Sequence, residues 1–77
     1  MNDIRLLQMQ VFRAVADNDG YAAAASALES SQLFVSRTIV ELERRLGAKL
    51  IHRNTHRRRL TAEGERYLAT CREISGA

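Results

Sequence analysis

No proline interrupts this sequence, and its apolar residues recur at spacings of three and four over most of its length. That spacing gives an α-helix one buried face, whereas a half-buried strand would alternate every second residue. The chain has 77 residues, which is room for one domain with a modest core. The pattern therefore predicts a single, mainly α-helical domain.

Four helices are expected, each next to residues that cap or end helices. They run from Ile4 to Asp17, from Tyr21 to Leu28, from Gln32 to Leu46 and from Ala62 to about Ser75. Ser30, Ser31 and Thr61 are N-cap candidates, and Gly47 is suited to end the third helix. The apolar stripes of the first three helices predict a core of Leu7, Val11, Phe12, Val15, Ala16, Tyr21, Ala24, Ala25, Leu28, Val35, Ile39, Leu42 and Leu46.

The third helix has a second face, which carries Leu33, Ser36, Arg37, Val40 and Arg44 opposite the core stripe. A helix that served only the core would not need an arginine-bearing outer face. After this helix, Lys49 to Arg53 and Arg57 to Leu60 are predicted to be two short strands of a basic hairpin.

Cations concentrate between Arg37 and Arg59. This stretch holds eight Lys or Arg residues against Glu41 and Glu43, although the whole chain has a net charge of only +3. Eleven of the twelve cations are Arg, whose planar guanidinium binds phosphate and guanine edges through two N–H groups. The charge favours a surface that binds a polyanion, with a solvated arginine-rich surface as the alternative.

The fourth helix carries its own apolar stripe, made of Tyr67, Leu68, Cys71 and Ile74. Such a stripe either docks on its own domain or pairs with a partner helix. Because three helices already supply a core, the partner helix is the favoured interpretation.

Helix, helix, turn, helix, basic hairpin and helix is the order of a winged helix-turn-helix protein. This mainly α fold has a three-helix core, a two-stranded wing and, here, a C-terminal linker or dimerisation helix. In that arrangement the second helix of the motif enters the major groove of DNA, where base edges carry a distinguishable pattern of donors and acceptors.

The same residues form an ordered set of short motifs. These are Phe12-Arg13-Ala14-Val15-Ala16, Tyr21 with Ala24-Ala25 and Leu28, Ser31-Gln32-Leu33-Phe34-Val35-Ser36-Arg37, Ile39, Leu42-Glu43, Leu46-Gly47, Leu50-Ile51-His52-Arg53 and Arg59-Leu60-Thr61-Ala62-Glu63-Gly64. In this order they resemble the N-terminal DNA-binding domain of the LysR-type transcriptional regulators, from about Leu6 to Ile74. The resemblance implies sequence-specific binding of double-stranded DNA, with palindromic half-sites, by a bacterial regulator.

The resemblance also implies roles for residues. Ser31, Gln32, Leu33, Ser36 and Arg37 would lie at the groove-facing start of a recognition helix of residues 31–46, and Arg53 would bind phosphate. Val40 on the outer face and His56, Arg57 and Arg58 in the basic wing of residues 49–60 complete the predicted DNA-binding residues. In the family the last helix pairs with its counterpart, so Tyr67, Leu68, Cys71 and Ile74 are expected at a homodimer interface.

The expected division is therefore a winged helix-turn-helix domain of residues 1–60 and a linker or dimerisation helix of residues 61–77. Family members carry an effector-binding domain after that helix, and no small-molecule effector site is expected within these 77 residues. An alternative function is a dimerisation module that sequesters full-length regulators.

Other classes of protein fit the sequence poorly. His52 and His56 have the spacing of a metal pair on a helix, but they fall in the basic hairpin. The single cysteine excludes an internal disulfide, and no nucleophile with its base or glycine-rich phosphate loop is present. No enzyme activity, cofactor or metal is expected. Without an apolar run of ~20 residues or a secretory signal, a cytoplasmic location with no membrane partner is expected.

Overall fold

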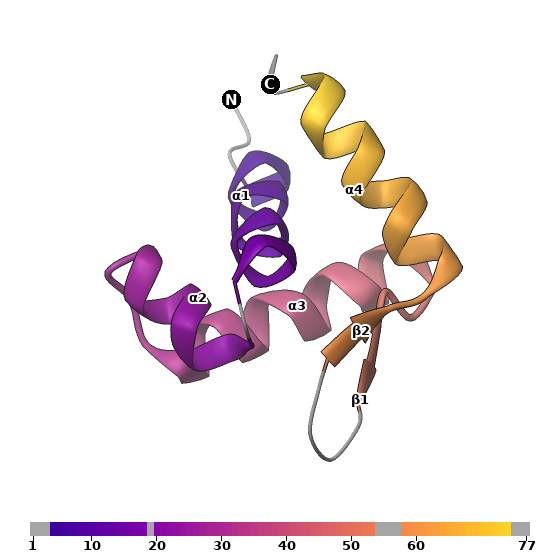
Figure 1. Cartoon of the computed structure of the whole chain (residues 1–77). Coiled ribbons are helices and arrows are strands. Elements are labelled where there is room, and N and C mark those ends of the chain that lie inside the picture. The colour runs from indigo at the N-terminus through magenta and orange to yellow at the C-terminus, as the bar shows by residue number, and fades with distance from the viewer. Residues whose placement is uncertain (1–3, 19, 54–57, 75–77) are drawn as a thin grey trace.

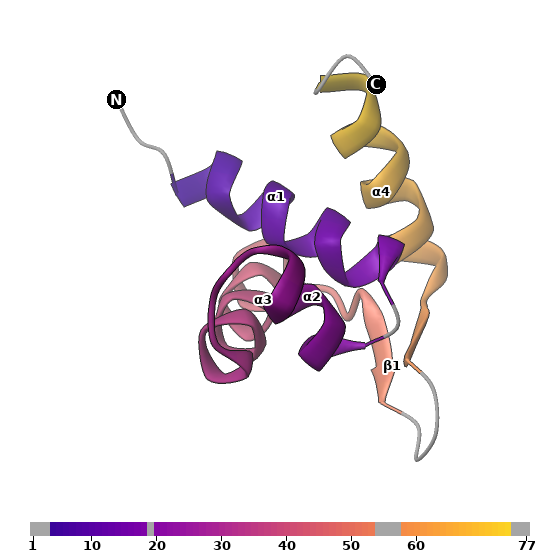
Figure 2. The ribbon, with the colours of Figure 1, turned by 60° about the vertical axis from the view of Figure 1, so that its left-hand side comes forward.

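The computed structural model describes residues 4–18, 20–53 and 58–74. In chain order the elements are α1 (Ile4–Asp17), α2 (Tyr21–Ala27), α3 (Gln32–Leu46), β1 (Ile51–Arg53), β2 (Arg58–Leu60) and α4 (Ala62–Ile74). The strands project from the end of α3, and α4 rises beside α1 (Figure 1). Seen after a 60° turn, α1 lies across α2 and α3 (Figure 2). The predicted winged helix-turn-helix fold is confirmed.

α3 begins and ends where capping chemistry predicts. Ser31 is the N-cap of α3, because its Oγ accepts a hydrogen bond from the backbone N–H of Phe34 at 3.0 Å. Gly47 ends α3 with a φ of 67°, a left-handed conformation that glycine adopts without strain. The bounds of α1 and α3 agree with the sequence prediction, and α2 ends one residue earlier than predicted.

The chain reverses sharply between α2 and α3. The N–H of Ser30 donates to the carbonyl of Ala25 at 2.8 Å, and the N–H of Glu29 donates to that of Ser26 at 3.1 Å. This pair of bonds is a Schellman motif, and it places Glu29 in the left-handed region with a φ of 54°. The turn thereby satisfies the last carbonyls of α2 and lets α3 begin at residue 32.

A single core joins all four helices and the base of the strands. Its largest fully buried side chains are Phe12, Ile39, Leu42, Leu50, Val11, Val35 and Cys71. Two residues of the predicted core, Leu7 and Leu46, are exposed instead. Leu7 lies near the start of α1, beside an open hollow that Phe34 also lines, and Leu46 is the last residue of α3. Hydrophobic periodicity identifies the apolar face of a helix, but it does not show how far along the helix neighbouring elements cover that face.

The stripe of α4 is covered mainly by this chain itself, which corrects the prediction that it awaits a partner. Leu68 is 7% exposed and Cys71 is fully buried. The ring of Tyr67 meets that of Phe12 edge to face, with centroids 5.2 Å apart. α1 contacts α2, α3 and α4. The side of α1 that α2 and α3 leave open is therefore covered by α4. In the stripe only Ile74, at 62%, is exposed.

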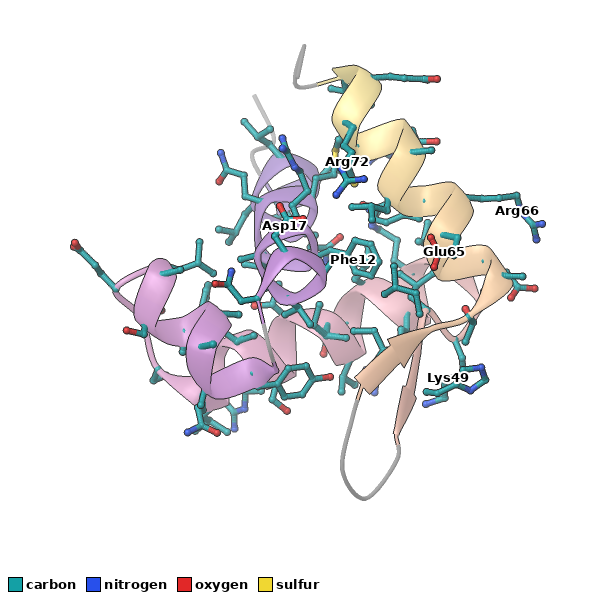
Figure 3. All side chains as sticks on the ribbon, viewed as in Figure 1. Phe12, Asp17, Lys49, Glu65, Arg66 and Arg72 are labelled. Carbon is teal, nitrogen blue, oxygen red and sulfur yellow. The ribbon has the colours of Figure 1, made fainter. Side chains whose placement is uncertain are left out.

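The contact between α1 and α4 also takes titratable groups out of water. Burial raises the pKa of the Cys71 thiol above its ordinary value of 9.0, and it raises the pKa of the Tyr67 hydroxyl above 10.0. Both groups are therefore neutral at pH 7, and Cys71 packs as a small apolar side chain. At the rim of the contact, Arg72 pairs with Asp17 at 3.0 Å (Figure 3). Because both side chains are about half exposed, this pair adds at most about 1 kcal/mol.

Candidate nucleic-acid interface

The surface of α3 that faces away from the core carries a row of side chains at three- and four-residue spacing. We call this row the outer ridge; its members are Leu33, Arg37, Val40 and Arg44, and all four are exposed. Val35 and Leu42 lie on the opposite side of the helix and are completely buried. One side of α3 therefore holds the domain together, and the other is free to contact a ligand.

The start of α3 presents the polar residues that were predicted to bind DNA. Gln32 is exposed and Ser36 is half-buried, so neither is enclosed in the core. Ser31 is exposed too, although its Oγ already accepts the capping hydrogen bond from Phe34. Its hydroxyl proton remains available to a ligand, because a hydroxyl donates as well as accepts.

A carboxylate on α3 anchors the beginning of the wing. Glu43 is only 8% exposed, and its Oε2 accepts hydrogen bonds from the backbone N–H groups of Leu50 at 2.9 Å and Ile51 at 3.3 Å. Its Oε1 lies 3.7 Å from the ammonium of Lys49. A buried carboxylate held by two N–H groups and one cation has its charge satisfied. The first strand of the wing is thus fixed to the helix that carries the outer ridge.

The start of α4 is anchored at the same place. The hydroxyl of Thr61 donates to the carbonyl of Lys49 at 2.6 Å and accepts from the N–H of Gly64 at 3.0 Å, which caps α4 as predicted. The backbone N–H of Thr61 donates to the carbonyl of Leu50 at 2.9 Å. Gly64 packs so tightly that a Cβ there would overlap the Leu50 carbonyl oxygen. We call the group of Glu43, Thr61, Gly64 and the backbone of residues 49–51 the wing anchor.

The wing strands pair antiparallel over three residues each, which is shorter than predicted. Ile51 pairs with Leu60, His52 with Arg59, and Arg53 with Arg58. The apolar pair adjoins the core, and the basic pair Arg53 and Arg58 lies at the end of the sheet farthest from it. Of the predicted DNA-binding residues, His56 and Arg57 lie outside the described residues.

Sequence reasoning gave no role to Glu43 or Gly64. Glu43 entered only as a negative charge within the basic stretch and as part of a motif, and Gly64 only as part of a motif. The available signal was an acidic residue directly after Leu42, on the side of the helix that is buried. An acid at such a position indicates a buried hydrogen-bond acceptor rather than a solvated charge.

Neither a metal site nor a membrane span emerges from the described parts of the chain. Within residues 4–18, 20–53 and 58–74, no three His, Cys, Asp or Glu side chains gather as metal ligands would. The helices in those ranges are too short or too polar to cross a bilayer. A helix-turn-helix with an exposed basic ridge, followed by a paired basic wing, defines the class of winged helix-turn-helix DNA-binding domains.

Comparison with known sequences identifies the family. Residues 6–65 match the family described as "Bacterial regulatory helix-turn-helix protein, lysR family". Among its relatives, the HTH-type transcriptional regulator DmlR of Escherichia coli (strain K12) is 46% identical over 67 residues, which are 86% of this chain and 22% of DmlR. An HTH-type transcriptional regulator of Xanthomonas campestris pv. campestris (strain 8004) is 42% identical over 65 residues, which are 84% of this chain and 19% of that protein. The chain thus spans about a fifth of the length of these two relatives.

Solved structures agree with the sequences. The CbnR_DBD–DNA complex superimposes with a TM-score of 0.86 at 37% identity, covering 99% of this chain and 84% of the solved one. The BenM_DBD/catB site 1 DNA complex gives a TM-score of 0.87 at 28% identity, covering 99% and 82%. The chain belongs to the LysR family of bacterial regulatory helix-turn-helix proteins. It is a DNA-binding domain of a LysR-type transcriptional regulator and not an enzyme.

Proposed function

We propose that this chain binds double-stranded DNA in a sequence-specific manner as a homodimer. α3 would lie in the major groove, and the wing would follow the phosphate backbone or enter the adjacent minor groove. The observation that carries the proposal is the outer ridge, which places Arg37 among exposed side chains on the side of α3 opposite the core. Two similar domains were solved in complex with DNA, which supports DNA binding by this chain.

On α3, the side chains divide by the chemistry that they offer to DNA. The amide of Gln32 matches the donor and acceptor that adenine presents in the major groove, and the guanidinium of Arg37 matches phosphate or guanine. The hydroxyls of Ser31 and Ser36 complete the polar contacts, and Leu33 and Val40 supply apolar ones. We assign specificity mainly to this helix.

In the wing, we assign contacts with phosphate to Arg53, His56, Arg57 and Arg58. Arg53 and Arg58 are partners in the register of the two strands, at the end of the sheet away from the Ile51–Leu60 pair. Arginine binds phosphate oxygens through two N–H groups, so this end of the wing is suited to the DNA backbone. The wing would therefore add affinity for any sequence.

The proposed dimer uses α4 of both copies. Because Leu68 and Cys71 lie in the core and Tyr67 packs on Phe12, Ile74 is the residue of the predicted stripe that remains available to a second copy. We propose residues 1–60 as the DNA-binding domain proper and residues 61–77 as the linker or dimerisation helix. The latter also completes the core of its own chain.

A titration of duplex DNA at several salt concentrations tests DNA binding. Each phosphate that the protein neutralises releases counterions, so log K should fall linearly with log salt, by about 0.9 per phosphate contacted. The slope counts contacts without knowledge of the target sequence. Absence of binding at low salt would refute the proposal, because electrostatic attraction is strongest there.

A further inference from the structure

An open groove lies between the start of α1 and the first part of α3. We call it the α1–α3 groove; Ile4 and Leu7 line it from α1, and Phe34, Arg37 and Glu41 line it from α3. Its three large apolar side chains are all exposed, Ile4 by 58%, Leu7 by 40% and Phe34 by 37%. Large apolar side chains that gather on a surface mark a place where another molecule binds.

The groove is separate from the surface that α4 offers. Among the described residues, those that line the groove come from α1 and α3. α4 meets α1 near its other end, where Arg72 pairs with Asp17. Ile4 and Asp17 are the two ends of α1, about 20 Å apart along the helix axis. Figure 2 shows the start of α1 and α4 on opposite sides of the molecule. A molecule bound in the groove would therefore leave the proposed α4 dimer contact open.

The charges of the groove argue against DNA as its occupant. Arg37 and Glu41 are both exposed and both line the groove, so it carries a positive and a negative charge. Phosphates close to the carboxylate of Glu41 would be repelled. Glu41 pairs with Arg44 at 3.6 Å, but both side chains are well exposed, so this pair is weak and Glu41 can bind another cation. The groove suits a protein surface that is apolar and carries one charge of each sign.

The chain itself has such a surface. In a contact with twofold symmetry the same patch occurs on both copies, and each pair of unlike residues is formed twice. Arg37 and Glu41 lie one helical turn apart on α3. A second α3 that runs antiparallel to the first can therefore place each Arg37 opposite Glu41 of the other copy. Ile4, Leu7 and Phe34 of the two copies would then cover one another and leave water.

We propose that the α1–α3 groove binds the same groove of a second copy of this chain. Apolar side chains form the centre of this contact, and two Arg37–Glu41 ion pairs form its rim. The contact is additional to the proposed pairing of α4, and it requires neither that pairing nor DNA. Because Arg37 also belongs to the outer ridge, the contact belongs to the chain that is free of DNA.

Reversal of the two charges tests the contact. All proteins in the test carry Ile74→Ser, which weakens pairing through α4, and sedimentation without DNA measures their association. Arg37→Glu puts Glu opposite Glu twice, and Glu41→Arg puts Arg opposite Arg twice. Each variant alone should therefore associate at least about tenfold more weakly than the chain with Ile74→Ser alone. An equal mixture of the two should regain the original association, because every pair across the contact is again of opposite charge.

Glu29→Arg is the matched control, because Glu29 is exposed in the turn before α3 and its reversal changes the net charge as Glu41→Arg does. This variant alone should associate normally, and its mixture with Arg37→Glu should not form the tight mixed pair, since one Glu–Glu contact remains. Leu7→Ser should weaken association through loss of the apolar centre.

Two results would overturn the inference. The first is a chain with Ile74→Ser that stays monomeric at about 1 mM. The second is a mixture of the two charge-reversed variants that associates no better than either variant alone, which would leave the groove to a different protein. Neither result bears on DNA binding, which the salt titration tests separately.

Discussion

At the scale of single residues, Gly64 has a strict steric requirement. A Cβ at this position would overlap the backbone carbonyl oxygen of Leu50 and lie 3.1 Å from its carbon. Backbone atoms cannot rotate aside as a side chain can, so the wing anchor must open to admit it. We expect Gly64→Ala to lower the free energy of unfolding by about 3 kcal/mol. This loss should appear although alanine favours a helix over glycine by about 1 kcal/mol.

Gly47 provides the comparison for that prediction. It has a φ of 67° and no atom within 4 Å of its added Cβ. Gly47→Ala should therefore cost only the backbone strain, about 1 kcal/mol. Urea denaturation of both variants measures the two losses. A Gly64→Ala protein as stable as the wild type would show that the Leu50 carbonyl does not limit this position.

At the scale of elements, α3 and the wing should contribute to binding in different ways. Gln32→Ala should weaken binding by about 1–3 kcal/mol at one base position only, because it removes a hydrogen bond to a base edge. Arg53→Ala should weaken binding to all sequences alike and reduce the salt slope by about 1, because it removes a phosphate contact. A duplex that the chain binds tightly is first selected from a random pool. Titration of both variants against this duplex and its single-base variants separates the two effects. A uniform loss in both would contradict the division of labour between helix and wing.

The elements also show how far sequence reasoning reaches. Local signals determined the limits of α3, since Ser31 and Gly47 act within one turn of the helix they cap. α4 packs on α1 through a contact between Phe12 and Tyr67, which are far apart in the sequence. Hydrophobic periodicity identified the apolar stripe of α4 but did not show that α1 covers it. The exposed start of α3 was predicted from its second face, whereas the wing anchor required knowledge of which backbone groups come near Glu43.

For the whole molecule, a dimer should place two recognition helices on one face of the duplex. Footprinting of the chain alone should then protect two symmetric half-sites, about 34–36 Å apart or a multiple of that distance. Sedimentation should show a dimer that Ile74→Ser weakens, because Ile74 is an exposed aliphatic residue at the end of α4. Ala22→Ser, an exposed position on α2, is the control and should leave the dimer unchanged. A dimer that protects no DNA would instead favour a module that sequesters related regulators.

The buried carboxylate of Glu43 has a consequence for the operators that such a protein tolerates. It ties the first strand of the wing to α3 through two backbone hydrogen bonds, so the helix and the wing keep a constant separation. In the proposed binding mode, in which both α3 and the wing contact DNA, a DNA site must match that separation. An extra base pair inserted between the segments that the helix and the wing occupy would turn one relative to the other by about a tenth of a full rotation. In the proposed binding mode, Glu43 therefore helps to set the length of the DNA site, together with the bases that α3 contacts.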